Sequence, residues 1–243
     1  MGQLCDKITC VEQCDYFNSQ SKIWLHKQSR YYLFKRLVDL IQKAKNTCNE
    51  FDQNKLGYFS QNKISDLGAS KLGQFLGQCL NISHLYLEMN DNLIGDDGSS
   101  ELGFGLSKCK NLITLSINLS GGNHIRERGA SNLAMSIGSC QKIINFKLNL
   151  FCNQIGAFGA TNLALGISKS QTLQNFTLFL RDDTIGDYGL CSLINNLSYC
   201  SNLSYLELII QDRSISSSAK MCMTQKIKKM KKLIQYQIMY LYL

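Results

Sequence analysis

The feature that most constrains the fold of this chain is an internal repeat of 30 or 31 residues that continues through most of its length. One small or sulfur-containing residue, one glycine and one isoleucine recur at this interval and stay in step with one another. Units of this length are stacked supersecondary elements, because none of them buries its apolar face alone. The three columns are Cys79, Cys109, Cys140, Ser170 and Cys200; Gly68, Gly98, Gly129, Gly159 and Gly189; and Ile64, Ile94, Ile125, Ile155, Ile185 and Ile215.

Each repeat contains two halves with different periods. One half alternates apolar and polar residues, as at Leu115, Ile117 and Leu119, which predicts a strand with one buried face. The other half places apolar or small residues every four positions, as at Gly129 and Leu133, which predicts one face of a helix. The strand pattern recurs at Leu85, Leu87 and Met89; Phe146, Leu148 and Leu150; Phe176, Leu178 and Leu180; Leu206, Leu208 and Ile210; and Tyr236, Ile238 and Tyr240.

A polar residue stands between each predicted strand and the following helix, at Asn92, Asn123, Asn153 and Asp183. Such side chains bond backbone groups where the chain leaves a strand, and stacked copies would form a ladder. Because helices are wider than strands, a stack of these units curves. The sequence therefore predicts an α/β horseshoe of about six repeats of 30–31 residues, with parallel strands on the concave face and helices on the convex face.

The repeat also resembles a known family. The pattern is Leu112-x-x-Leu115-x-Ile117-x-Leu119-x-x-x-Asn123-x-Ile125-x-x-x-Gly129-x-x-x-Leu133-x-x-x-Ile137, which resembles the leucine-rich repeat of the ribonuclease-inhibitor-like subfamily. The cysteine that ends each helix and the bias toward Asn, Gln and Lys are similar to leucine-rich repeat proteins of ciliates. Some of those relatives are joined to a protein-kinase domain. The resemblance covers about residues 49–243 and implies a protein-binding surface.

The two ends of the chain depart from the repeat. Residues 1–28 have no clear period, and their three cysteines are too widely spaced for a typical zinc site, so we expect an N-terminal arm. Residues 29–61 predict a helix and a degenerate capping repeat, followed by the repeat solenoid over 62–243. The last predicted strand is apolar and has no clear cap, which leaves an open edge. Truncation of the sequence, self-association through this edge and cover by another protein are the three alternatives.

The sequence offers no constellation of catalytic residues. His26, His84 and His124 have no convincing Ser or Cys and Asp partners by position, and the kinase motifs are absent. We expect no enzyme activity, no cofactor and no metal, and the aspartates of the loops are interpreted as helix caps. The 11 cysteines are odd in number and no signal peptide opens the chain. No apolar run is long enough to span a membrane, so we expect a cytoplasmic protein with reduced thiols.

The net charge of +8 is concentrated near the C-terminus, because six of the 26 basic residues lie within 220–232. The other 20 basic residues nearly balance the 18 acidic ones, which argues against a nucleic-acid-binding protein. A weak contact with an anionic surface such as a membrane is the functional candidate for these lysines. The candidate residues are Lys226, Lys228, Lys229, Lys231 and Lys232.

Residues between the buried strand positions point into the concave surface, where their identities are free to serve binding. Phe151, Phe179, Arg181 and Tyr205 are expected to lie close together on repeats three to five. Aromatic and arginine side chains dominate binding hot spots, so this group is the best candidate for a binding patch. The full candidate set is Tyr86, Glu88, Lys147, Phe151, Phe179, Arg181, Tyr205 and Glu207.

These observations favour a non-enzymatic protein–protein interaction module that binds a protein on its concave strand face. The resemblance adds two alternatives. The first is a regulatory or scaffold protein that is a fragment or paralogue of a kinase-linked leucine-rich repeat protein. The second is a GTPase-activating protein, since one family with this repeat type has that activity, although no residue of this chain indicates it. The sequence leaves the partner and the oligomeric state open.

Overall fold

The computed structural model describes residues 59–79, 81–181 and 184–240. The predicted N-terminal arm (1–28), nearly all of the predicted capping segment (29–61) and the last three residues lie outside the described part of the chain. Within that part, helices and strands alternate without exception. The helices are α3 (Asp66–Leu76), α4 (Asp96–Ser107), α5 (Glu127–Gly138), α6 (Gly156–Ser168), α7 (Gly186–Leu197) and α8 (Ser217–Lys228). The strands are β1 (His84–Glu88), β2 (Thr114–Asn118), β3 (Asn145–Asn149), β4 (Asn175–Arg181), β5 (Tyr205–Gln211) and β6 (Gln235–Tyr240).

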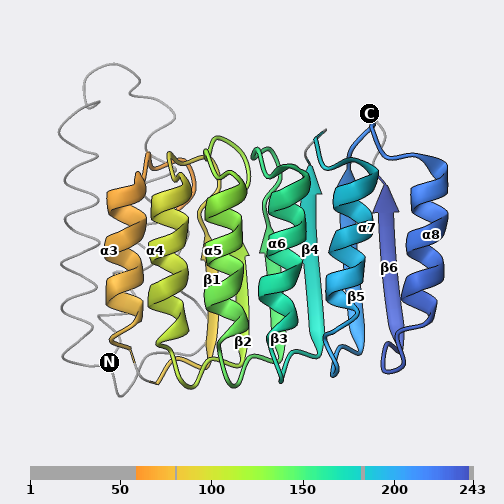
Figure 1. Cartoon of the computed structure of the whole chain (residues 1–243). Coiled ribbons are helices and arrows are strands. Elements are labelled where there is room, and N and C mark those ends of the chain that lie inside the picture. The colour runs from red at the N-terminus through yellow and green to blue at the C-terminus, as the bar shows by residue number, and fades with distance from the viewer. Residues whose placement is uncertain (1–58, 80, 182–183, 241–243) are drawn as a thin grey trace, which may run out of the picture. The chain divides into compact units, whose positions relative to one another are not determined.

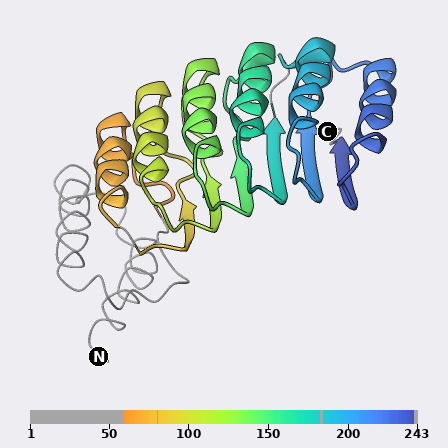
Figure 2. The same ribbon diagram turned by 60° about the horizontal axis from the view of Figure 1, so that its bottom comes forward.

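The six strands form one parallel sheet whose spatial order is the order of the sequence, β1 to β6 (Figure 1). All six helices lie on the same side of this sheet, and the row of helices is longer than the row of strands (Figure 2). The strands therefore line the inner side of an arc and the helices its outer side. This arrangement confirms the predicted α/β solenoid of leucine-rich-repeat type.

Equivalent positions of successive repeats are paired across the sheet. Leu115 of β2 pairs with Leu85 of β1 and with Phe146 of β3, and Phe146 pairs with Phe176 of β4. All four side chains are buried, and the rings of Phe146 and Phe176 stack with centroids 5.5 Å apart. The predicted alternation is therefore confirmed for these strands, and the apolar rows form one continuous core between the sheet and the helices.

Glycines allow the helices to approach one another closely. A side chain at Gly105 of α4 would collide with the backbone of Gly73 in α3, and one at Gly138 of α5 would collide with Gly166 in α6. Only a residue without Cβ fits at such contacts. The seam between α7 and α8 differs, because α8 contains no glycine.

Three carboxylates at helix starts, those of Asp66, Asp96 and Asp187, accept hydrogen bonds from backbone N–H groups at the start of the helix in the next repeat. Asp66 Oδ1 accepts hydrogen bonds from the backbone N–H groups of Gly95 (2.6 Å) and Gly98 (2.8 Å) at the start of α4. Asp96 Oδ1 does the same for Gly129 at the start of α5, at 2.9 Å. A negative charge here also favours the positive end of the helix dipole. Each cap therefore joins two repeats.

Buried asparagines form the predicted ladder between the strands and the helices. Asn123 is 4% exposed, and its Oδ1 accepts a hydrogen bond from the N–H of Ile94 in the preceding repeat at 3.0 Å. Its Nδ2 donates to the carbonyl of Met89 in the preceding repeat at 3.0 Å and to that of Leu119 in its own repeat at 3.1 Å. Asn92 and Asn153 make the equivalent bonds to the segments that precede them by about one repeat.

The last strand is less buried than the others. Tyr236 is 38% exposed and Ile238 is half-buried, whereas the equivalent Leu206 and Leu208 of β5 are fully buried. In the described part of the chain, β6 pairs with β5 alone. The reduced burial follows, because apolar rows are covered by the repeats on both sides and β6 has a neighbour on one side.

The strand register is tested by Leu148→Asp. Leu148 is fully buried in β3, so an aspartate there places a charge in the middle of the core. We expect a loss of about 4 kcal/mol in the free energy of unfolding, measured by chemical denaturation. The matched control is Asn149→Asp, the next residue, which faces the opposite side of β3 and should change stability little. Equal losses in the two variants would contradict the register.

The asparagine ladder is tested by Asn123→Ala. The substitution leaves the Ile94 N–H and the Met89 carbonyl buried without the amide that bonds both. We expect a loss of about 2 kcal/mol in the free energy of unfolding. Asn132→Ala is the control, because its exposed amide bonds only the Ser100 hydroxyl in the adjacent helix and its loss should cost less than about 0.5 kcal/mol. A loss at Asn123 as small as that at Asn132 would contradict the role of the ladder.

Candidate protein-binding surface

The candidate surface is the side of the sheet that faces away from the helices. Residues between the buried strand positions lie there, and none of them belongs to the core rows described above. Lys147 of β3, Arg181 of β4 and Tyr86 of β1 are exposed, and Tyr86 has 42% of its surface exposed. Because these side chains do not hold the repeats together, the surface can differ in chemistry from one strand to the next.

Near the middle of this surface Phe179 contacts two other predicted residues, Phe151 and Lys147, and we call these three residues the aromatic cluster. The rings of Phe151 and Phe179 meet edge to face, with centroids 5.9 Å apart and an interplanar angle of 79°. The Lys147 ammonium lies over the Phe179 ring at 5.1 Å from its centroid. Edge-to-face pairs contribute about 0.5–1.5 kcal/mol beyond area burial, and an exposed cation–π contact about 0.5–1 kcal/mol.

The backbone fixes the position of each ring in the aromatic cluster. Phe179 lies within β4, where it pairs with Asn149 of β3. Phe151 follows β3 in the turn, and its N–H donates to Asn149 Oδ1 at 3.0 Å. The ring of Phe179 is therefore positioned by β4. The ring of Phe151 is positioned by the turn after β3, which is hydrogen-bonded to β3 itself. The contacts hold the cluster in one arrangement without a partner.

An apolar row extends from the aromatic cluster toward the C-terminal repeat. Phe179 pairs with Ile209 of β5, which pairs with Met239 of β6. Ile209 is only 7% exposed, and Met239 is half-buried. The candidate set from the sequence lacks these two residues, although they share a repeat column with Phe179. Arg181 lies two residues beyond Phe179 on the same face and is exposed.

Tyr205 and Glu207 of β5 form a second, separate group. The Thr177 hydroxyl of β4 donates to Glu207 Oε2 at 3.1 Å, and the Tyr205 side chain is also hydrogen-bonded to Glu207. Burial raises the pKa of Tyr205, and the charge of Glu207 raises it further. Tyr205 is thus a neutral phenol at physiological pH, and the Glu207 carboxylate accepts bonds from two hydroxyl groups.

The expectation that Tyr205 lies close to Phe151, Phe179 and Arg181 is wrong. Tyr205 pairs with Asn175 at one end of β4, whereas Arg181 pairs with Gln211 at the other end. Six residues separate these two ends along β5, which is about 20 Å in an extended strand. The repeat columns correctly predict which residues are neighbours across the sheet. Residues at the start and at the end of a strand, however, remain far apart even when they share a face.

Tyr86 and Glu88 lie on β1 and do not belong to the aromatic cluster, because β2 lies between β1 and β3. Glu88 Oε2 accepts a hydrogen bond from Asn118 Nδ2 of β2 at 2.6 Å. The eight predicted residues are therefore distributed over three places. These are the aromatic cluster with Arg181, the Tyr205–Glu207 group, and the Tyr86–Glu88 group.

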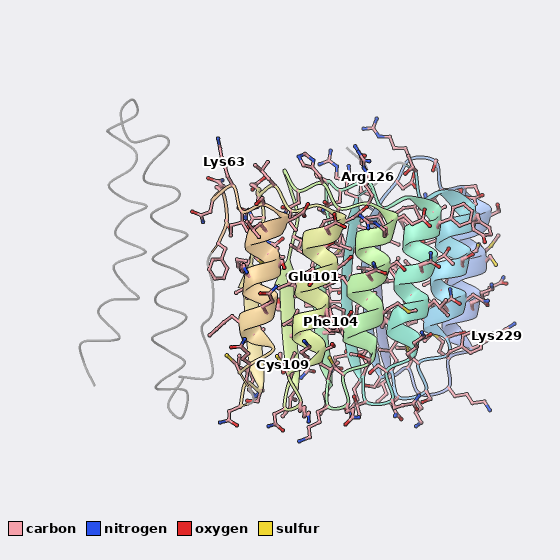
Figure 3. The ribbon with its side chains drawn as sticks, turned by 60° about the vertical axis from the view of Figure 1, so that its left-hand side comes forward. Lys63, Glu101, Phe104, Cys109, Arg126 and Lys229 are labelled. Atoms are coloured by element: carbon pink, nitrogen blue, oxygen red, sulfur yellow. The ribbon has the colours of Figure 1, made fainter. Side chains whose placement is uncertain are left out.

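The predicted lysine group lies on α8 and in the turn that follows it, not on the strands of the sheet. Lys226 and Lys228 are on α8, and Lys229, Lys231 and Lys232 lie in the turn between α8 and β6. Lys229 is at the far end of the row of helices from Lys63 (Figure 3). Lys226 Nζ donates to Asn195 Oδ1 at 3.4 Å, and Lys232 Nζ donates to Asn202 Oδ1 at 2.7 Å.

The four described cysteines of the repeat column are buried. Burial raises the pKa of Cys109 and Cys200 to about 12 and that of Cys140 to about 11, which keeps these thiols protonated at neutral pH. Their sulfur atoms donate to carbonyls of the preceding repeat, as from Cys109 Sγ to the Leu76 oxygen at 3.2 Å. Among the described residues, no group of three or more His, Cys, Asp or Glu side chains is placed to hold a metal ion.

None of the helices in the described part of the chain has the length and apolar character needed to cross a membrane.

No protein-family model matches the chain, and no curated protein matches it either. Among solved structures, the chain is similar to actin-binding site 2 of leiomodin-1, with 13% sequence identity and a TM-score of 0.49. The match covers 67% of this chain and 87% of that chain.

Proposed function

We propose that this protein is a non-enzymatic interaction module that binds a protein partner on its concave strand face, with the aromatic cluster as the centre of the site. The observation that carries the proposal is that Phe179 contacts both Phe151 and Lys147 on the face of the sheet that lies away from the helices and the core. A large rigid surface of this kind suits a protein partner better than a small ligand, because among the described residues the sheet face is open on this side (Figure 2).

The contacts within the aromatic cluster support its use as a hot spot. Binding costs about 0.5–1.5 kcal/mol for each flexible side chain that becomes ordered. Phe151 and Phe179 already fix each other, and Lys147 is already placed over a ring, so less of this cost remains. Arg181 adds a planar cation at the edge of the same face. Aromatic and arginine side chains are enriched among residues that dominate binding energy.

The charges around the aromatic cluster indicate the chemistry of the partner. Lys147 and Arg181 are both cationic and exposed. Arg181 lies two residues beyond Phe179 on β4, and Lys147 lies on the neighbouring strand β3. The carboxylate of Glu207 is occupied by Thr177 and Tyr205. The partner that fits presents an apolar side chain to the rings and one or two carboxylates to the cations.

The regulatory and GTPase-activating alternatives rest on the family resemblance alone, and no described residue favours either. The regulatory alternative uses the same surface, so the identity of the bound protein separates it from a simple adaptor. A protein kinase or its substrate among the bound proteins would support it.

The proposal is tested by affinity capture from native cell extract followed by mass spectrometry. The double variant Phe151→Ala/Phe179→Ala removes both rings of the aromatic cluster. The matched control is Phe158→Ala/Tyr188→Ala, which removes an equivalent edge-to-face pair at 5.9 Å from α6 and α7 on the helical side. We expect the concave variant to lose a partner that the wild type and the control both retain. With the purified partner, its Kd should rise at least about tenfold.

Two results would contradict this site. Retention of every bound protein by the concave variant would show that the aromatic cluster does not bind. Loss of binding in the helical control alone would move the site to the convex face. Both variants must show the wild-type circular dichroism spectrum, which excludes unfolding as the cause.

A further inference from the structure

The seam between α7 and α8 brings two cysteines together. Lys226 of α8 donates to Asn195 of α7, which fixes the alignment of the two helices at that level. One turn earlier on each helix, four residues back, stand Cys222 and Cys191. The same diagonal contact occurs between α4 and α5, where Asn132 Nδ2 donates to the Ser100 hydroxyl at 3.1 Å. Counted from the start of each helix, Cys191 and Cys222 occupy the equivalent positions of α7 and α8, so their side chains face each other across the seam.

These two thiols differ from the other described cysteines in their exposure. Cys79, Cys109, Cys140 and Cys200 are buried in the repeat column. Cys222 is exposed and Cys191 is half-buried, so a small reagent reaches the pair from solvent. Cys152 is also exposed, but it lies in the turn after β3, on a different part of the molecule.

The environment of the pair distinguishes the roles of its two thiols. Burial raises the pKa of Cys191, and the neighbouring Cys222 raises it further. Cys191 therefore stays protonated at neutral pH. Cys222 is the more exposed of the two residues, so we expect it to react first with a reagent from solvent.

The seam between α7 and α8 lacks the glycine-mediated backbone contacts of the earlier seams. α8 has no glycine, so its backbone cannot approach α7 as α4 approaches α3 through Gly105 and Gly73. The two helices are held by side chains, and Ala219, Met223 and Ile227 are the only buried residues of α8. A covalent bond between facing side chains would strengthen the seam that has the fewest backbone contacts between its two helices.

We propose that Cys191 and Cys222 form a reversible disulfide across this seam, with a small-molecule disulfide such as oxidised glutathione as the oxidant. The Cys222 thiolate attacks one glutathione sulfur, forms a mixed disulfide and releases one glutathione thiolate. Cys191 then loses its proton to solvent and attacks the Cys222 sulfur, which displaces the second glutathione thiolate. The two protein thiols give up two electrons, and one glutathione disulfide is reduced to two thiols.

The bridge would fix the last described helix to the repeat before it. α8 is the partner of β6, the strand whose outer edge is unpaired among the described residues. The redox state of the pair would thus control how firmly the last described repeat is held. This site is independent of the aromatic cluster, because it lies in the helical layer.

The test is incubation of the full chain with oxidised glutathione, followed by alkylation, trypsin digestion and mass spectrometry. The expected product is a linked pair of peptides, residues 182–213 with residues 221–226, that dithiothreitol separates. Because peptide 182–213 contains both Cys191 and Cys200, Cys200→Ser is the matched control and should keep the link. Cys191→Ser and Cys222→Ser should each abolish it. The oxidised wild type should also unfold at a higher temperature than the reduced wild type.

Three outcomes would overturn the proposal. One is a product in which Cys222 remains a mixed disulfide with glutathione and Cys191 is found alkylated, which would show that Cys191 was still a free thiol. Another is a link that survives Cys191→Ser and disappears in Cys200→Ser, which would assign the bond to the buried column. The third is a link that appears only in a dimer band on a non-reducing gel, which would place the bond between two chains.

Discussion

In three successive repeats a buried asparagine amide, that of Asn92, Asn123 or Asn153, holds the turn that leads from strand to helix, and the stacking of these repeats depends on it. The chain reverses direction here, so its backbone groups lose their sheet partners while they stay buried. Each such group would cost about 1–3 kcal/mol if it were left without a hydrogen bond. The amide of Asn123 supplies both an acceptor and a donor, and it reaches the preceding repeat with each of them. The repeats are therefore joined at their turns as well as through the core.

The ladder also explains how a repeat of 31 residues fits among repeats of 30. Asn92 and Asn153 each donate to the carbonyl three residues before them, whereas Asn123 donates to the carbonyl of Leu119 four residues before it. The extra residue lies in this turn, where Gly121 has a φ of +77°. Glycine accepts this conformation without strain. The turn absorbs the insertion, and the amide reaches the same backbone groups.

Much of this fold is predictable from the sequence, because burial imposes a period on it. The rows at Leu115 and Leu148, the parallel order of the strands and the asparagine ladder all follow from residues that recur every 30 or 31 positions. The concave site was predicted less well. Tyr205 and Arg181 share a face but lie at opposite ends of their strands, and a column pattern does not measure distance along a strand. The Cys191–Cys222 pair was missed because it joins positions 31 apart where the repeat is 30, so the two residues do not share a column.

Because equivalent positions of successive repeats pair in register, the core residues occupy one face of the sheet and the candidate binding residues occupy the other. If a whole unit containing β3 were lost by recombination, β2 would pair with β4, and Leu115 would lie opposite Phe176 as one core residue against another. The core rows would remain intact. On the other face, Phe179 would lie opposite Asn118, and Lys147 and Phe151 would be gone. The gain or loss of a single repeat therefore leaves a chain that still folds but changes the residues on its binding face. The number of repeats thus becomes an inherited determinant of which partner is bound.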